Sequence, residues 1–595
     1  MVILPLIAVC MMMLWLTNPA VFWSPDEGCK FIQMKGMTNL SGSEYALPYG
    51  ARQDDPSLAY YPKGGIYPKP GVKKGQISFC WPRWFPLLSR WMFDVMGILG
   101  LYVLPAIAGI GAVLVAGLAA WKIVPVYAPV VMLIAGLASP MLFYCFLFCE
   151  YPIAVFLAML AFVMVIRSFE SQLRSSLLYL FLAAVILGMA TALRFDILSF
   201  AGALGFTTFW MLASSSGHTR QLARPAASIL LVLMAVVAVS ALVYRLLPDG
   251  GAVAFLQFPS YRDLWLETKE RLSSLAPWLD LPRYALWIFI NNPAEFGINL
   301  PTPWVMLAVA GATLGIVSAF IKPSRISQIL WIVSSALVLS VSLLALALPE
   351  RYRAVHGLLI SAPWIMLCLF RPGEADETST TRFIGRLLCV YLIFHFSASL
   401  FVSRADGGPE WGSRFALVFY PMAAILAGSR WVEIMKHDDR ITIMRTVNSV
   451  IAAMLVIVGI GFNARGVVEI VQTRNDFHRI EEQINRHSGT PVVTDIWWLS
   501  AAMAPSFVSR PFYTVDKNND LSSWLKEIGS GNSRFLMITQ ALETLKPGNN
   551  IPCGLSTIEI WNVRGIFVFL LGVEPVRNEL LSPNHGDGFN KIPGA

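Results

Sequence analysis

Long apolar runs dominate the pattern of hydrophobic and polar positions along this chain. An α-helix needs about 20 apolar residues to cross a bilayer, and windows near that length recur as far as about residue 465. The pattern predicts about thirteen membrane-spanning helices. Their expected ranges are 2–22, 92–121, 125–145, 150–167, 177–194, 197–213, 226–247, 302–321, 326–348, 355–371, 383–403, 414–434 and 446–464. Boundaries are soft around Pro140 and Pro152, which leave two runs poorly divided.

The pattern changes after about residue 465. Short or alternating apolar runs are separated there by polar and Gly/Pro stretches, which is typical of strands with helices between them. The runs are TPVVTDIWW (490–498), RPFYTV (510–515), SRFLMIT (533–539) and GIFVFLL (565–571). We therefore expect a membrane domain over 1–465 and a small soluble α/β domain over 466–595. This second domain has no Gly-rich phosphate loop and no acid–His constellation, so we expect substrate docking or a structural lid there.

The first polar loop, 23–90, is too long for a simple connector and is assigned to the membrane domain. Its end, FCWPRWFPLLSRWMF (79–93), is rich in Trp and suits a helix lying in the headgroup layer. Its middle carries Lys63, Lys69, Lys73 and Lys74. These lysines could bind a lipid phosphate. They are equally typical of a solvated loop that rests on anionic lipid.

Composition supports a polytopic membrane protein. The chain is 56% hydrophobic and 14% charged, with a mean hydropathy of +0.60, which is far more apolar than one soluble core requires. The first run lacks a basic start and a small-residue cleavage site, so we expect a retained span. The net charge of +8 is explained by Lys and Arg in cytoplasmic loops and needs no nucleic acid as a partner.

Basic residues fix the expected orientation. With a cytoplasmic N-terminus, about fourteen Lys and Arg fall in inner turns and about five in short outer turns. The loop 23–90, the segment 249–300 and the chain after about residue 465 are then extracytoplasmic. We expect an inner or plasma membrane protein whose site and C-terminal domain lie outside the cytoplasm.

The stretch WSPDEGCKFIQMKGM (23–37) places an acid pair, Asp26 and Glu27, where the first span meets water. Ser24, Pro25 and Glu27 match a capping box with proline at the first helical position. A carboxylate held at a helix start beside apolar surface is also well placed to act as a general base. The residues alone leave both interpretations open.

Further charges fall at the same outward ends of the spans. The acids Glu150 and Asp196 do so, and so do four arginines: Arg194, Arg351, Arg353 and Arg414. A single acid at a helix end usually only reaches water. Charges collected at one boundary point instead to a site.

The cysteines and histidines of the sequence predict neither a required disulfide nor a metal site. Cys29 and Cys80 share the outer loop and are free to pair in an oxidising compartment, although their spacing does not demand it. Cys145 and Cys149 are expected to be packing residues. The seven histidines form no cluster with metal-ligand spacing, so no metal site is predicted.

Five motifs together resemble the GT-C glycosyltransferases, most closely their dolichyl-phosphate-mannose-protein mannosyltransferase and aminoarabinose-transferase branch. WSPDEGCKFIQMKGM (23–37) is similar to that branch's Pro-Asp-Glu entry motif, and FCEYPIAVFLAMLAF (148–162) to its second acidic turn. ATALRFDILSFAGAL (190–204) resembles an Arg-x-acid turn, although Asp196 stands where relatives have Glu. RAVHGLLISAPWIM (353–366) and GGPEWGSRFALVFYPMAAIL (407–426) resemble later turns.

The resemblance implies an inverting sugar transfer from a polyprenyl-phosphate donor to a lipid, glycan or protein acceptor at the outer face. Asp26 is then the expected base, with Glu27 positioning it or only capping the helix, and with Glu150 and Asp196 as supporting acids. The donor phosphate is expected to meet the basic residues Arg194, Arg351, Arg353, Arg414 and Lys63. No cofactor is fixed by the resemblance, and a divalent cation stays open.

Two other functions compete with this one. A secondary transporter or lipid flippase has as many spans, but it should show repeats and broken helices with polar residues at the midplane, and neither is evident in the sequence. A scaffold protein would leave the acid pair as a cap only.

Overall fold

The structure is a computed structural model of the 595-residue chain. It describes residues 21–37, 46–62, 67–70, 77–78, 81, 84–123, 125–194, 196–215, 289–290, 302–347, 357–371, 379–402, 413–436, 442–516, 520–528, 534–540, 555–563 and 565–573. Two compact units are present: Met1–Pro48 with Ile66–Asn475, and Tyr49–Gly65 with Asp476–Ala595. The predicted span 226–247 lies outside the described residues, as does the predicted span 2–22 up to residue 20.

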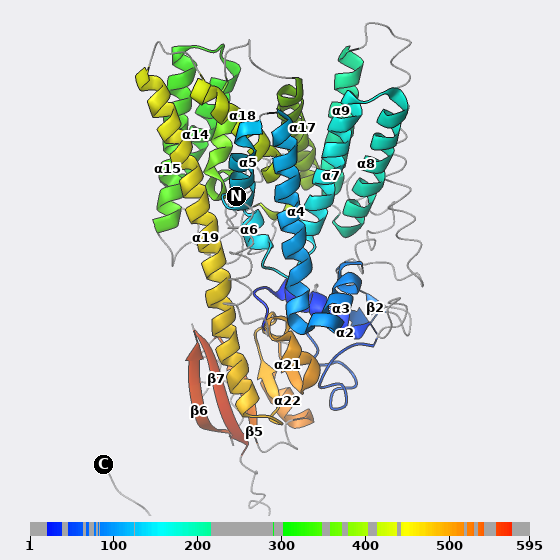
Figure 1. Ribbon diagram of the computed structural model, residues 1–595. Coiled ribbons are helices and arrows are strands. Elements are labelled where there is room, and N and C mark those ends of the chain that lie inside the picture. Colours follow the sequence, from blue (N-terminus) through cyan, green and yellow to red (C-terminus); the bar gives the residue numbers. More distant parts are fainter. Residues whose placement is uncertain are drawn as a thin grey trace, which may run out of the picture. The chain divides into compact units, whose positions relative to one another are not determined.

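The first unit is helical (Figure 1). Its described elements are α2 (Pro25–Gly36), β1 (Lys69–Pro70), β2 (Ile77–Ser78), α3 (Trp84–Met96), η1 (Gly97–Leu99), α4 (Gly100–Ile123), η2 (Pro125–Tyr127), α5 (Ala128–Gly136), α6 (Met141–Tyr144), α7 (Tyr151–Glu170), α8 (Leu173–Leu193), α9 (Ile197–Ser215), α14 (Thr302–Phe320), α15 (Arg325–Ala347), α16 (Leu358–Ser361), η3 (Pro363–Leu369), α17 (Ser379–Val402), η4 (Arg414–Ala416), α18 (Phe419–Lys436) and α19 (Thr442–Arg486). The last of these helices continues into the second unit. Gly97 has φ of +62°, a left-handed conformation that glycine adopts without strain, and it separates α3 from α4.

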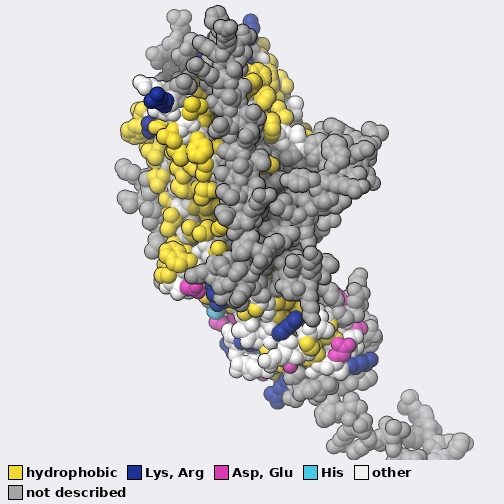
Figure 2. Space-filling model, turned by 90° about the vertical axis from the view of Figure 1, so that its right-hand side faces the viewer, with side chains coloured by type: hydrophobic (Ala, Val, Ile, Leu, Met, Phe, Trp, Pro, Cys, Tyr) yellow, Lys and Arg dark blue, Asp and Glu magenta, His cyan; other side chains and the backbone are white. Residues whose placement is uncertain are grey.

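Six helical segments of the described chain are long and apolar enough to cross a membrane. They contain α4, α7, α8, α14, α15 and α19, and they coincide with the predicted spans 92–121, 150–167, 177–194, 302–321, 326–348 and 446–464. Hydrophobic side chains cover most of the described surface of this unit in Figure 2. The chain is therefore an α-helical membrane protein, and the total of thirteen spans stays a prediction.

Two of the predicted spans are broken. The run 125–145 divides into η2, α5 and α6, and Pro140 stands immediately before α6. The run 355–371 divides into α16 and η3, and Pro363 opens η3 after Ala362 leaves the helical region. Proline cannot donate the next backbone hydrogen bond of a helix, which explains why apolar length alone gave the wrong expectation of continuous helices here.

Buried side chains satisfy carbonyls at the two breaks. The Trp364 indole donates to the Ala138 carbonyl (2.6 Å), and Trp331 donates its indole N–H to the Met366 carbonyl (2.8 Å). Asn463 donates to the Ser361 carbonyl (2.9 Å). Irregular backbone is tolerated at membrane depth when protein groups satisfy it in this way.

Helix packing brings the ends of several helices to one end of the first unit. Helix α7 packs against α8 and α4, while α17 packs against α9 and α18 (Figure 1). The start of α7, the end of α8 and the start of α9 lie at the same end, because successive helices run in opposite directions. Glu150, Arg194 and Asp196 occupy these positions.

The second unit contains a five-stranded sheet in the order β4-β3-β5-β7-β6. Its strands are β3 (Val492–Thr494), β4 (Phe512–Thr514), β5 (Arg534–Thr539), β6 (Leu555–Val563) and β7 (Ile566–Val573), and its short helices are α20 (Leu499–Ala502), α21 (Ala504–Ser509) and α22 (Leu521–Glu527). Strand β3 is parallel to β4 and β5, whereas β7 is antiparallel to β5 and β6. Four of these strands lie in the four predicted runs, and β6 was not predicted.

Part of the first polar loop belongs to this second unit. The Gly50 amide donates to the Phe507 carbonyl (3.1 Å), and the Thr514 amide donates to the Tyr60 carbonyl (2.9 Å). Asp55 is buried and accepts from the backbone amide of Tyr60 at 2.9 Å, so the segment is held in a defined turn. The contacts thus group Tyr49–Gly65 with the second unit, whereas the sequence analysis placed the whole loop 23–90 with the membrane domain, and the domain boundaries stay a prediction.

Candidate active site

Helix α2 begins at the acid pair. Ser24 is its N-cap, and Pro25 occupies the first turn. The Glu27 amide donates to Ser24 Oγ (3.4 Å), and the Ser24 amide donates to Glu27 Oε2 (3.1 Å). This is a capping box, so the local structure predicted for the motif is present.

Glu27 is buried and its carboxylate is fully used. Oε2 accepts from the amides of Trp23 (2.9 Å) and Ser24, and Oε1 accepts from the amide of Phe148 (2.6 Å) and from Arg474 (3.1 Å). A carboxylate offers about four acceptor positions. With four donors in place, Glu27 joins α2, the α6–α7 connection and α19, and it has no lone pair left for a substrate proton.

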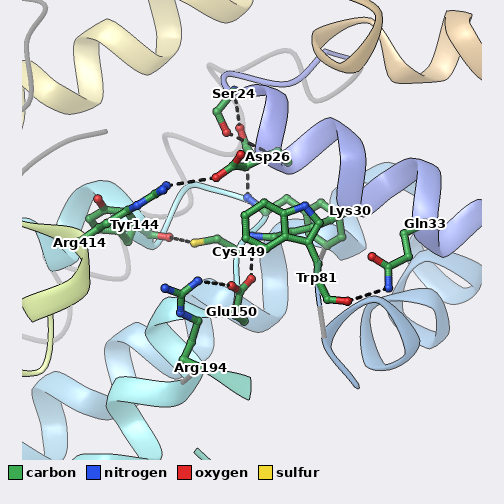
Figure 3. A network of polar contacts seen from close by, with 12 residues as sticks. Ser24, Asp26, Lys30, Gln33, Trp81, Tyr144, Cys149, Glu150, Arg194 and Arg414 are labelled. Carbon is green, nitrogen blue, oxygen red and sulfur yellow. Dashed lines mark hydrogen bonds and ion pairs between the residues drawn. The ribbon is translucent and has the colours of Figure 1, made fainter. Parts of the chain in front are cut away.

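Asp26 is placed differently. Its Oδ2 accepts from Arg414 of η4 at 3.1 Å, and its side chain is 21% exposed compared with 1% for Glu27. No described residue donates to its second oxygen. Figure 3 shows Asp26 at the start of α2, facing Arg414. A partly exposed carboxylate with an open oxygen is accessible to an acceptor group, which a general base requires.

Glu150 joins two cations. Its Oε2 lies 2.7 Å from Lys30 Nζ, and its Oε1 accepts from Arg194 at 3.0 Å (Figure 3). Arg194 also donates through Nε to Asp196 Oδ1 at 2.7 Å. Four charged groups from α2, the α6–α7 connection and the α8–α9 turn are thus held in one chain of ion pairs.

Aromatic rings cover the cations of this site. Lys30 Nζ lies 4.4 Å from the Trp81 ring centroid, and the Arg194 guanidinium carbon lies 4.0 Å from that of Tyr151. Arg474 is similarly placed over Tyr102 at 4.4 Å. Such cation–π contacts are strongest where water is excluded. They fix the orientation of these three side chains.

The structure brings together all the predicted site residues that it describes. These are Asp26, Glu27, Glu150, Arg194, Asp196 and Arg414, which lie far apart in the sequence. Arg351, Arg353 and Lys63 lie outside the described residues, as does Cys80, whose pairing with Cys29 the sequence left open. Cys145 and Cys149 are buried in the connection around α6, as expected for packing residues.

Sequence analysis missed two cations of the site. Lys30 lies one turn after Asp26 on α2, so helical spacing could have indicated that it shares a face with the acid pair. Arg474 gave no such signal, because it lies in the part of α19 that the sequence analysis assigned to the soluble domain. Both side chains are nearly inaccessible to solvent.

No group of three or more metal-ligating side chains is present in the described parts of the chain. The four acids of the site each face a lysine or arginine. Asp26 and Asp196 each have one oxygen that accepts from no described residue. These two oxygens are the acceptors that the site leaves open to a substrate group.

No family model and no curated protein sequence matches the chain. Among solved structures, the fold is similar to ArnT from Cupriavidus metallidurans bound to undecaprenyl phosphate, at 10% identity and a TM-score of 0.44, covering 96% of this chain and 98% of that chain. It is also similar to an oligosaccharyltransferase from Archaeoglobus fulgidus in complex with zinc and sulfate, at 14% identity and a TM-score of 0.43, covering 90% of this chain and 67% of that one.

Both of these proteins are GT-C superfamily members, the superfamily that the sequence motifs resemble. The likeness is one of fold alone.

Proposed function

We propose that this protein is an inverting glycosyltransferase that uses a sugar linked to a polyprenyl phosphate and transfers it to an acceptor at the outer face of the membrane. The observation that carries the proposal is the contrast between Asp26 and Glu27. One carboxylate of the pair is saturated by structural donors, while the other is partly exposed and accepts a hydrogen bond from Arg414. The capping interpretation therefore accounts for Glu27, whereas Asp26 takes no part in the capping box and faces Arg414 instead.

The reaction is a single displacement. The acceptor oxygen or nitrogen attacks the anomeric carbon, Asp26 takes the acceptor proton, and the bond between that carbon and the phosphate oxygen breaks. The electron pair leaves with the polyprenyl phosphate. One base and one attack from the face opposite the leaving group give inversion, and general-base assistance contributes about 10²–10⁴-fold.

Charge on the leaving phosphate needs cations. Arg414 is the described candidate, because a guanidinium can hold Asp26 with one N–H group and a phosphate oxygen with others. Arg351, Arg353 and Lys63 remain proposed phosphate ligands. Arg194 is less suited to that role than its sequence position suggested, because two carboxylates already engage it.

Lys30, Glu150, Arg194 and Asp196 act in this proposal as positioning residues. Their ion pairs link the start of α2 to the ends of α7, α8 and α9. A buried ion pair is costly to break, by about 3–5 kcal/mol when one partner is removed. The network therefore keeps Asp26 at a fixed place while substrate enters.

The positive-inside distribution supports an inner or plasma membrane protein with this site on the extracytoplasmic side. Nucleotide sugars are absent there, and a lipid-linked sugar reaches the site through the bilayer. The acceptor class, whether lipid, glycan or protein, and any divalent cation are left open by the residues of the site.

A lipid flippase is the second candidate, because the two broken helical segments are a feature of transporters. The breaks themselves are apolar, however: 137–149 and 357–370 contain no charged residue. The charged cluster lies at the helix ends instead, which favours chemistry at the surface of the membrane over passage through it.

Product analysis distinguishes the two functions. Purified protein in lipid is given a polyprenyl-phosphate sugar, and the products are analysed by mass spectrometry and by NMR of the anomeric proton. We expect free polyprenyl phosphate together with a glycosylated acceptor of inverted configuration. Movement of intact donor between leaflets without bond cleavage would contradict the proposal.

A further inference from the structure

A cavity lies in the first unit away from the acid cluster. It has a volume of about 540 Å³ and lies between α9 and α17, with Arg371 after η3 completing its wall. The lining residues are Phe206, Thr207, Trp210, Arg371, Arg382, Gly385, Arg386, Cys389 and Val390. Cavities of about 300–1,000 Å³ are of the size that binds small molecules and headgroups.

This cavity is distant from the candidate active site. Helix α9 begins at Ile197, directly after Asp196, and Trp210 follows thirteen residues later. At 1.5 Å per residue this separation is about 20 Å along the helix. The cavity is therefore at the opposite end of α9, which the positive-inside distribution assigns to the cytoplasmic leaflet.

Three arginines concentrate positive charge on the cavity. Arg382 and Arg386 are one helical turn apart on α17 and share a face, and all three arginines are exposed. Arg371 donates to the Ala319 carbonyl at 3.3 Å. Within the described residues no acid pairs with any of the three, so the cavity carries excess positive charge and favours an anion.

A buried hydroxyl supplies an independent sign of a missing partner. Thr207 is 2% exposed, and its Oγ1 has no hydrogen-bond partner among the described residues. Its neighbour Thr208 donates to the Leu204 carbonyl one turn earlier, at 2.6 Å. An unsatisfied buried hydroxyl costs about 1–3 kcal/mol, and a phosphate oxygen in the cavity would satisfy it.

The apolar part of the lining suits an acyl chain. Trp210 and Phe206 are 53% and 43% exposed although they flank three arginines. Tryptophan at the level of the headgroups and arginine beside it are the usual neighbours of a lipid at the membrane interface.

We propose that this cavity binds the headgroup of an anionic phospholipid of the cytoplasmic leaflet. Arg371, Arg382 and Arg386 hold the phosphate, Thr207 donates its hydroxyl to it, and the acyl chains lie over Phe206 and Trp210. Basic pockets between membrane helices on the cytoplasmic side bind anionic lipids in this way. A zwitterionic lipid is disfavoured because its positive end adds to the charge already present.

Labelling of Cys389 tests the site, because this exposed thiol lines the cavity. The full-length protein is reconstituted in phosphatidylcholine vesicles without and with phosphatidylglycerol, treated with a small thiol reagent, and mapped by mass spectrometry so that Cys389 is read alone. A lipid present at ten times its Kd should slow labelling about tenfold. Inorganic phosphate in phosphatidylcholine vesicles is the third arm, and it should protect little.

Arginine variants test whether the protection of Cys389 depends on the charges of the cavity. Arg382→Gln combined with Arg386→Gln should abolish the protection given by phosphatidylglycerol, while Arg325→Gln, an exposed arginine outside the cavity, should keep it. If the double variant fails to fold, the three arms with the unaltered protein still decide the matter.

Three results would overturn the proposal. Equal labelling rates in phosphatidylcholine vesicles with and without phosphatidylglycerol would mean that no anionic headgroup protects the cavity. Protection by inorganic phosphate equal to that by phosphatidylglycerol would assign the cavity to a soluble ion. Slow labelling without phosphatidylglycerol that becomes fast when Glu374, Asp376 and Glu377 are neutralised would assign the arginines to acids of the chain itself.

Discussion

Asp26 and Glu27 are adjacent in the sequence, yet their carboxylates have different surroundings. Successive residues of a helix point about 100° apart, so one side chain turns toward Phe148 and Arg474 while the other turns toward Arg414. The sequence predicted an acid pair at a helix start, and the residues alone left a cap and a general base open as interpretations of the pair. The division of roles depends on hydrogen-bond donors from α19 and from the α6–α7 connection, which no local sequence pattern predicts.

Arg414 should affect use of the donor more than folding. Arg414→Ala removes a charge-assisted hydrogen bond, of the kind that contributes about 1.5–3 kcal/mol, so kcat/KM for the donor should fall about 10–100-fold. Arg414→Lys keeps the charge without the planar fork and should lie between. Arg325→Ala is the matched control. If Arg414→Ala lowers the melting temperature but leaves donor kinetics unchanged, the residue is structural.

Two aspartates of the second unit should give pH dependences of opposite sign. Burial raises the pKa of Asp495 above its usual 3.8, although Thr539 donates to it. Asp495 therefore stays protonated to a higher pH in the folded protein than in the unfolded chain. Stability is lost as pH rises from about 3.8 through the raised pKa. The Ser523 amide lowers the pKa of Asp520, so this group loses its stabilising effect as pH falls.

Melting temperature against pH measures both effects. Asp495→Asn should gain stability relative to the unaltered protein as pH rises above 4. Asp520→Asn should be less stable than the unaltered protein at neutral pH, and this difference should disappear as pH falls below 4. The same slope in both variants would contradict the assignment.

At the scale of elements, the sequence predicted what local patterns determine. The start of α2 and the long helices α7, α8, α14 and α15 follow from a capping motif and from apolar length. The breaks around α6 and before η3 were not predicted as breaks, although Pro140 and Pro363 were visible. Whether proline ends a helix there depends on partners such as Trp364 and Asn463, which come from distant parts of the chain.

Ser24→Ala tests the cap of α2. Loss of an N-cap side chain costs about 0.5–2 kcal/mol, and we expect the lower part of this range because the bond from the Glu27 amide is 3.4 Å long. The variant should melt at a lower temperature and keep most of its transfer activity. Loss of activity at unchanged stability would give Ser24 a direct role in the site.

At the scale of the whole molecule, the predicted orientation determines where the chemistry occurs. The acid cluster and the chain after about residue 465 are both assigned to the outer side by the distribution of Lys and Arg. The broken segments 125–145 and 355–371 each enter this count as one crossing, so the orientation needs its own test.

Accessibility of the second unit provides that test. Lys526 is an exposed residue of α22, and a cysteine placed there should react with a membrane-impermeant thiol reagent in intact cells. Arg325→Cys, at the start of α15, should react only after the inner face is opened. The reverse pattern would invert the topology and put the acid cluster in the cytoplasm.

The most direct test of the central claim is the transfer rate of Asp26→Asn. Asparagine keeps the size of aspartate and can still accept a hydrogen bond from Arg414, but it cannot take the acceptor proton. In purified full-length protein with a polyprenyl-phosphate sugar, we expect an unchanged melting temperature, retained donor binding and a turnover reduced by about 10²-fold or more. Transfer near the unaltered rate by a folded Asp26→Asn protein would contradict the account, and Asp196 would then be the acid with an open oxygen left to test.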